Sequence, residues 1–104
     1  MQFLLIAYDG TDDKALDRRM AVRHEHVERN DELRDEGNLL FGAAILDDYG
    51  KMIGSTLVYD FEKRSDLDQW LEKEPYVTGK VWERIDIVPC RVGPSFAHLA
   101  KVPG

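Results

Sequence analysis

The chain has 104 residues, of which 14 are basic and 20 acidic, so its formal net charge is −6 at neutral pH. This length predicts a single domain over residues 1–104, and 43% hydrophobic with 33% charged residues is typical of a globular protein. The negative charge would repel a phosphate backbone, which argues against nucleic acid as a partner.

The opening residues, MQFLLIAYDG, hold an apolar run too short for a signal peptide or a membrane span. We therefore expect a cytoplasmic protein that does not enter the membrane. Cys90 is the single cysteine, which excludes an internal disulfide and a cysteine-based zinc cluster. The sequence contains no glycine-rich nucleotide motif, so we expect no cofactor.

The first half of the chain predicts a strand, a long helix and a second strand. The apolar run at 3–8 is a strand that ends at the turn pair Asp9-Gly10. A helix of about 22 residues follows, with candidate N-caps at 11–13 and a stop at Gly37. LLFGAAIL at 39–46 is the second strand.

The second half predicts a strand, a short helix and a last strand. A turn at 47–50 leads into the strand at 55–61, which forms a hairpin with the preceding strand. Ser65 and Asp68 resemble a capping box at the start of the helix, and Pro75 ends it. The last strand is 81–92, and residues 93–104 are expected to form a loose C-terminal tail.

The predicted order βαββαβ indicates an α+β, ferredoxin-like fold, in which two helices cover one face of a four-stranded antiparallel sheet. The first strand is apolar on both of its faces, because Phe3-Leu5-Ala7 and Leu4-Ile6-Tyr8 alternate along it. Two helices cannot cover both faces of the sheet. We therefore expect a homodimer in which the open sheet faces of two copies stack.

The long helix has two apolar ridges on its predicted inward face. At about 100° per residue, one ridge spans about 40° and the second lies about 100° or more from it. The first ridge contains Leu16, Met20 and Val27, and the second contains Val22 and Leu33. We expect both ridges to pack toward the sheet.

Arg23, His26 and Asn30 fall between the two ridges, at i, i+3 and i+7. Burying such groups costs about 1–3 kcal/mol each unless they find partners. One interpretation is a partly exposed helix, with Arg23 extending into solvent and His26 donating to a carbonyl. The other is the polar floor of a pocket.

His24 lies on another face of the helix, because residues two apart do not share a face. His24 and Glu28, at i and i+4, could share a metal ion, but a solvated helix face is the favoured interpretation. We therefore predict no metal site.

Two carboxylates are candidate partners for His26. Asp9 closes the first strand and Glu74 lies in the turn after the second helix, and either could orient an imidazole. The alternatives are a turn residue at Asp9 and a solvated charge at Glu74. Ser55, next to Gly54 at the start of the third strand, could offer its hydroxyl to a ligand or mark a plain strand entry.

Segments along nearly the whole chain resemble the YciI family. They are AYD at 7–9, RRMAVRHEH at 18–26, the glycine at 42, GSTLVYDFE at 54–62 and EPYVTGKVWE at 74–83. The resemblance implies a ferredoxin-like fold and a dimeric α+β barrel. It also implies a relationship to muconolactone isomerase and chloromuconolactone dehalogenases, and a site centred on a histidine and an aspartate.

By position, the resemblance makes His26 the family's histidine, with Arg23 beside it, and Asp9 the aspartate of the first strand. The family's D-P-Y turn is here Glu74-Pro75-Tyr76, in which the carboxylate is longer by one methylene. We therefore predict catalytic roles for His26, Asp9 and Glu74. Substrate binding is expected from Arg23, Ser55, Tyr76 and Gly42.

These residues predict a small cofactor-free lyase or isomerase in which His26 moves a proton on a ring or lactone substrate. Asp9 or Glu74 would orient the imidazole, and Arg23 would hold a carboxylate or enolate. The alternative is a dimeric module that binds or senses a small molecule without turnover. A third possibility is an accessory domain whose polar residues serve only the dimer.

Overall fold

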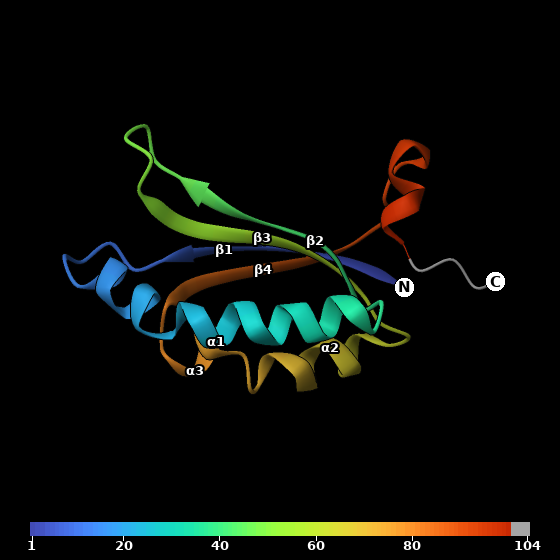
Figure 1. The fold of residues 1–104 in the computed structure, drawn as a ribbon, viewed down its shortest axis with the longest axis horizontal. Coiled ribbons are helices and arrows are strands. Elements are labelled where there is room, and N and C mark those ends of the chain that lie inside the picture. Colours follow the sequence, from blue (N-terminus) through green and yellow to red (C-terminus); the bar gives the residue numbers. More distant parts are fainter. Residues whose placement is uncertain (101–104) are drawn as a thin grey trace.

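Four antiparallel strands form one sheet in the order β2-β3-β1-β4. In the computed structural model, which describes residues 1–100, the strands are β1 (Gln2–Asp9), β2 (Leu39–Leu46), β3 (Met52–Asp60) and β4 (Trp82–Cys90). The helices lie on one face of this sheet (Figure 1). The ferredoxin-like α+β fold is thereby confirmed.

The helical layer consists of α1 (Ala15–Asp35), α2 (Arg64–Leu71) and α3 (Pro75–Thr78). The sequence analysis did not predict α3, a single turn that follows α2 directly. Pro75 occupies its first position, where a missing N–H costs nothing, and the side chain of Glu74 accepts a hydrogen bond from the backbone N–H of Tyr76. Glu74 is therefore an N-cap and not the solvated charge considered above.

The first turns of α1 and α2 differ in detail from the predictions. Lys14 occupies the N-cap position of α1 and makes no side-chain capping bond, while Asp12 accepts a hydrogen bond from the Lys14 N–H at 3.2 Å. At α2 the carboxylate of Asp66 accepts from the Lys63 N–H at 3.3 Å. The helix thus begins one residue before Ser65, and the predicted box from Ser65 to Asp68 is wrong.

The core lies between the sheet and the helices, where alternate residues of the central strands point. Its buried side chains include Phe3, Leu5, Ala7, Leu57 and Tyr59 from the sheet, and Leu33, Leu67, Leu71 and Tyr76 from the helices. The alternate side chains of β1, which include Leu4 and Ile6, are also apolar and point to the opposite, open face of the sheet. The predicted alternation of β1 is therefore observed.

The first predicted ridge of α1 is wrong, because Met20 and Val27 are 51% and 39% exposed. The buried residues of α1 are instead Ala15, Arg19, His26 and Leu33. These residues face the sheet because the polar side chains among them form hydrogen bonds with residues of β1, β3 and the segment before α3. Those partners offset the cost of burying an arginine and a histidine.

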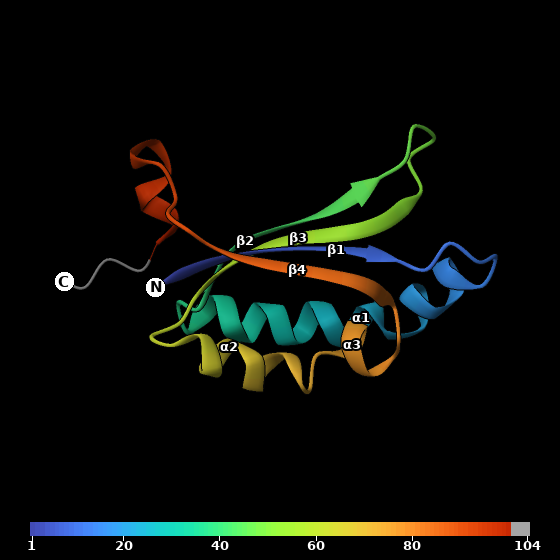
Figure 2. The same ribbon diagram turned by 180° about the vertical axis from the view of Figure 1, so that it is seen from behind.

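The sheet face opposite the helices is open and carries the second side-chain set of β1, which includes Leu4 and Ile6. The loop between β2 and β3 rises on this side at one end of the sheet. The 3-10 helix η1 (Pro94–Leu99) rises on the same side at the other end, and Figure 2 shows both from behind.

A loose tail was predicted from residue 93, whereas 94–99 form a 3-10 helix, and 101–104 lie outside the described residues. Within residues 1–100, none of the helices combines the length and the apolar character needed to cross a membrane. The expected cytoplasmic location stays a prediction.

Candidate functional site

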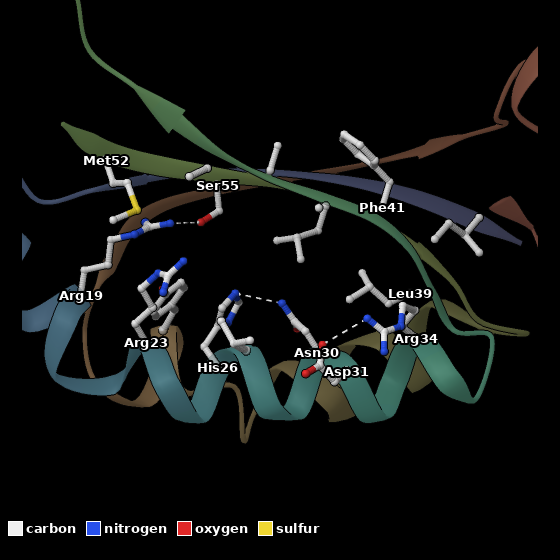
Figure 3. Close-up of a pocket in the computed structure, with 17 residues that line it drawn as sticks. Arg19, Arg23, His26, Asn30, Asp31, Arg34, Leu39, Phe41, Met52 and Ser55 are labelled. Carbon is white, nitrogen blue, oxygen red and sulfur yellow. Dashed lines mark hydrogen bonds and ion pairs between the residues drawn. The ribbon is translucent and has the colours of Figure 1, made fainter. Parts of the chain in front are cut away.

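A pocket of about 320 Å³ lies between α1 and the strands β2 and β3. Polar side chains of α1 enter it from one side and strand residues from the other (Figure 3). Its lining includes Arg19, Arg23, His26 and Asn30 from α1, Gly42 from β2, Ser55 from β3 and Tyr76 from α3. The volume is at the small end of the range for ligand pockets, so a single ring fits it better than a large cofactor.

His26 lines this pocket and forms a buried pair with Glu74, which is not part of the lining. The imidazole Nδ1 hydrogen-bonds to Glu74 Oε1, and the two side chains are 9% and 0% exposed. Glu74 Oε1 also accepts from the Tyr76 N–H at 3.2 Å, which fixes the carboxylate relative to α3. Because a carboxylate only accepts hydrogen bonds, Nδ1 carries the proton and Nε2 is the ring atom left for chemistry.

Aromatic rings and a guanidinium hold the His26 ring in place. Tyr76 stacks on it with ring centres 3.8 Å apart and planes inclined by 15°, and Trp82 meets it edge-on at 6.1 Å. The guanidinium of Arg19 lies over the other ring of the stack, 4.6 Å from the centre of Tyr76. The imidazole therefore has little freedom to turn.

Arg19 and Asp9 form a second buried pair beside the first. Arg19 Nη1 donates to both carboxylate oxygens of Asp9, at 3.0 and 3.1 Å, and Nη2 donates to the Ser55 hydroxyl at 2.9 Å. Trp82 Nε1 donates to the same hydroxyl at 3.2 Å. Ser55 thus links β3 to α1 and β4, and its hydroxyl accepts from two protein donors.

Burial and charge oppose each other at Asp9. Burial raises the pKa of this carboxyl above its ordinary value, and the Arg19 charge and hydrogen bonds, with Arg18 farther off, lower it by less. Burial likewise raises the pKa of Tyr76, against the opposing charges of Arg19 and Arg23. Burial is also the main cause that raises the pKa of Tyr59, and the Glu74 charge adds to it.

Arg23 is exposed and points into the pocket, and it makes no hydrogen bond or ion pair within residues 1–100 (Figure 3). Its charge is therefore available to an anionic ligand. Gly42 lines the pocket from β2, where a Cβ would meet Leu57 Cδ2 at 3.3 Å. Tyr76 lines it from α3.

His24 and Glu28 form an exposed ion pair at 2.8 Å on the outer side of α1. Among the described residues, no group of three histidine, cysteine or acidic side chains is arranged to hold a metal ion. His24 and Glu28 thus lie on a solvated face of α1, which is the interpretation that the sequence favoured.

The structure brings His26, Glu74 and Tyr76 together, with Arg23 on the same pocket wall. It places Asp9 and Ser55 in a neighbouring network, where Asp9 bonds to Arg19 and not to His26. Sequence reasoning missed Arg19 as a buried residue. The spacing in the sequence could have indicated it, because Arg19 precedes His26 by seven residues and therefore lies on the same face of the helix.

The fold and the pocket define a small ferredoxin-like α+β protein with a buried histidine–carboxylate pair. The YCII-related domain matches residues 1–91, and the chain belongs to this family. The resemblance to the YciI family is thereby confirmed. The chain is 33% identical over 95 residues to the protein YciI of Escherichia coli, a match that covers 86% of this chain and 95% of that protein.

A protein of Haemophilus influenzae is 28% identical over the same shares of the two chains. Among solved structures, a 5-chloro-2-hydroxyhydroquinone dehydrochlorinase from Burkholderia phenoliruptrix, in complex with 2,5-dihydroxybenzoquinone, is similar with a TM-score of 0.77. It is 19% identical, and the match covers 91% of this chain and 98% of that one. An antibiotic biosynthesis monooxygenase is similar with a TM-score of 0.51 and 17% identity, over 89% and 98% of the two chains. These two likenesses concern the fold.

Proposed function

We propose that the protein is a cofactor-free lyase or isomerase that moves a proton on a small ring or lactone. The observation that carries this proposal is the buried His26–Glu74 pair, whose histidine lines a pocket sized for one ring. A histidine oriented by a carboxylate is the usual arrangement for general acid–base chemistry near neutral pH.

Each residue at the pocket has a distinct role in the proposal. His26 Nε2 accepts the substrate proton, while Glu74 holds Nδ1–H and stabilises the charged ring that forms. Arg23 binds a carboxylate, phenolate or enolate oxygen. Gly42 lines the pocket wall without a side chain and so offers its backbone to the ring. Asp9 and Ser55 act through Arg19, whose position they fix, so we assign them to positioning.

The proposed step begins with the transfer of a proton from a substrate C–H or O–H bond to Nε2. In an elimination, the electron pair left behind expels an adjacent anion, and the net change is the loss of one HX molecule. In an isomerisation, the proton returns to a different carbon and the formula is unchanged. Both reactions balance without an oxidant. The dehydrochlorinase of similar fold supports the choice of a chlorinated hydroxyquinol as the first probe.

The test is turnover of 5-chloro-2-hydroxyhydroquinone and of muconolactone, followed by chloride release and by absorbance. We expect His26→Gln to lower the rate by about 10²- to 10⁴-fold, the usual contribution of general acid–base catalysis. Lys80→Gln, at an exposed position outside the pocket, is the control. Equal rates for the native chain and His26→Gln would refute the proposal.

The rival function, a module that binds or senses a small molecule, predicts another outcome of the same experiment. Calorimetric titration with both probes would then give tight binding that depends on Arg23, with no turnover by the native chain. That result would reject catalysis while keeping the pocket.

We further propose that the protein is a homodimer that stacks two open sheet faces. Apolar side chains cover this face, and among them Phe41 and Val88 are 50% and 49% exposed. The register places Val88 beside Leu4, and Phe41 beside Val58, so these residues form one continuous surface. A second copy fits because the β2–β3 loop and η1 rise at opposite ends of the face, where they could hold a partner (Figure 2).

A further inference from the structure

Asn30 lies one helical turn beyond His26, and the proposed function gives it no role. Its amide nitrogen Nδ2 is 3.0 Å from His26 Nε2, the ring atom opposite the Glu74 contact. Its Oδ1 is buried and has no hydrogen-bond partner among the described residues. An amide with one end bonded and the other end idle is costly in a buried site, unless the idle atom serves another state of the protein.

The two ends of the imidazole impose different requirements. At Nδ1 the Glu74 carboxylate always accepts, so that nitrogen keeps its proton whether the ring is neutral or charged. At Nε2 the requirement reverses with the charge of the ring. The neutral ring needs a donor there, and the charged ring needs an acceptor.

A side-chain amide can meet both requirements, because its oxygen and nitrogen exchange places when it turns by half a rotation. We propose that Asn30 is a positioning residue that follows the proton on His26. Nδ2 donates to Nε2 of the neutral ring, and after the amide turns, Oδ1 accepts from Nε2–H of the charged ring. Figure 3 shows Asn30 beside the ring on the same wall of the pocket.

This inference rests on the proposed function in one respect, since it concerns the ring atom that would accept a substrate proton. A substrate that reaches Nε2 takes the place of the Asn30 amide. Once the proton is on the ring and the substrate has left, the turned amide holds the charged ring in the same orientation. Asn30 therefore keeps Nε2 directed at the same point in both states.

Other charged and titratable groups face His26 from the elements around it, so the test must separate Asn30 from them. They are Glu74 before α3, Tyr76 on α3, Arg19 and Arg23 on α1, and Asp9 on β1, which acts through Arg19. Glu74 bonds Nδ1, and Asn30 is the described residue hydrogen-bonded to Nε2. A measurement made at Nε2 itself is therefore specific for Asn30.

The experiment is nitrogen NMR of the free protein, with no substrate. While the spectrum shows Nε2 unprotonated, we expect a coupling across the hydrogen bond between Asn30 Nδ2 and His26 Nε2, with Nδ1 protonated. The pH is then lowered until the spectrum shows Nε2 protonated, and that coupling should vanish because Oδ1 has become the acceptor. A coupling that is absent while Nε2 is unprotonated would overturn the inference, as would one that survives protonation of Nε2.

Asn30→Asp gives a second test, because a carboxylate can accept but cannot donate. At a pH where the native spectrum shows Nε2 unprotonated, we expect His26 to be protonated on both nitrogens in this variant, because a carboxylate beside Nε2 favours the charged ring. Gln69→Glu makes the same change of amide to carboxylate at an exposed position on α2 and should keep the native pattern. An Asn30→Asp spectrum identical to the native one would also reject the proposal. Because no substrate is involved, these results stand apart from those of the turnover assay.

Discussion

The imidazole of His26 and the carboxylate of Glu74 meet in the protein interior although the two residues are 48 positions apart in the chain. Their contact exists because α3 begins at Pro75 and presents its N-cap to the middle of α1. Glu74 thereby serves two purposes with one oxygen, as the cap of a helix and as the partner of a histidine. The pair is thus tied to the fold as well as to the pocket.

Glu74→Gln should separate these two purposes. The amide oxygen can still accept from the Tyr76 N–H and from His26 Nδ1, so we expect a folded protein. The negative charge that would stabilise a protonated ring is lost, so we expect turnover of the chlorinated hydroxyquinol to fall by roughly 10²-fold or more. Steady-state rates and circular dichroism of the same samples measure the two effects.

Glu74→Asp is the matched variant, since it keeps the charge and the capping ability but is shorter by one methylene. We expect a folded protein with activity between those of the native chain and Glu74→Gln. If the Gln variant retained the native rate, Glu74 would be a structural cap without a part in catalysis.

Arg19→Leu should destabilise the protein in a pH-dependent way. The change leaves the Asp9 carboxylate buried without its partner, which costs about 3–5 kcal/mol when the group is ionised. The pKa of Asp9 is already raised in the folded protein, and it rises further when the opposing Arg19 charge is removed. Urea unfolding at about pH 4 and about pH 7 measures the effect.

The sign of the effect follows from that direction. A raised carboxyl pKa means that the stability contributed by the protonated form is present below the ordinary value of 3.8 and is lost as the pH rises through the folded-state value. The difference between Arg19→Leu and the native chain should therefore be larger at about pH 7 than at about pH 4. A constant difference would mean that Asp9 is not the group left unpaired.

Arg18→Leu is the control for this experiment, because its partner Asp12 is on the surface. The Arg18 hydrogen bond lowers the pKa of Asp12 to about 2, so the associated stability is present above the ordinary value and is lost as the pH falls through about 2. Both measurements lie above that window. Arg18 is also the weakest of the charges that lower the pKa of Asp9, so we expect the Arg18→Leu difference to be small and to change with pH much less than that of Arg19→Leu.

The sequence predicted most of the fold because strand patterns and breakers are local signals. The strand at 39–46 matches β2 at both ends, and the alternation of β1 correctly indicated two apolar faces. β3 begins at Met52, three residues before the predicted start, because Gly54 was interpreted as a strand entry although it lies inside the ladder. Glycine weakens local strand signals, so its pairing with Tyr8 could not be read from the pattern alone.

The site was less predictable, because it depends on how α1 is rotated about its own axis. The sequence placed His26 on the inward face between two apolar ridges, whereas the structure exposes Met20 and Val27 of the first ridge and buries Arg19 with His26. The rotation of α1 is decided by Asp9 on β1 and Glu74 before α3, which bond to Arg19 and His26. A pattern within the helix does not contain these contacts. The choice between Asp9 and Glu74 as the partner of His26 depended on the same tertiary contacts.

Gly54→Ala should destabilise the protein strongly. Gly54 lies in β3 opposite Tyr8, and a Cβ there would overlap the backbone carbonyl of Ala7, which cannot move without disturbing the ladder between β1 and β3. We expect a loss of about 1–3 kcal/mol in the free energy of unfolding, the usual cost of overpacking. Urea unfolding gives the value.

Gly42→Ala is the matched comparison, because its Cβ would approach the Leu57 side chain to 3.3 Å and would meet the Thr56 carbonyl only at an ordinary contact distance of 3.9 Å. A side chain can shift by the few tenths of an ångström required, so we expect a smaller loss than at Gly54. Equal losses at the two positions would show that the close approach between β1 and β3 is not the cause.

Val88→Asp should separate the proposed dimer into monomers. Val88 lies on the open face beside Leu4 and is 49% exposed in the single chain, so stacking two sheets would bury it. A charge placed there would have to be desolvated, at a cost of several kcal/mol. Sedimentation velocity at micromolar concentration should give about twice the 12.0 kDa chain mass for the native protein and the single mass for the variant.

Met20→Asp introduces the same charge at a residue of 51% exposure on α1, away from that face, and should remain dimeric. A native protein that sediments as a monomer would refute the stacked-sheet arrangement, and so would a Val88→Asp variant that keeps the double mass.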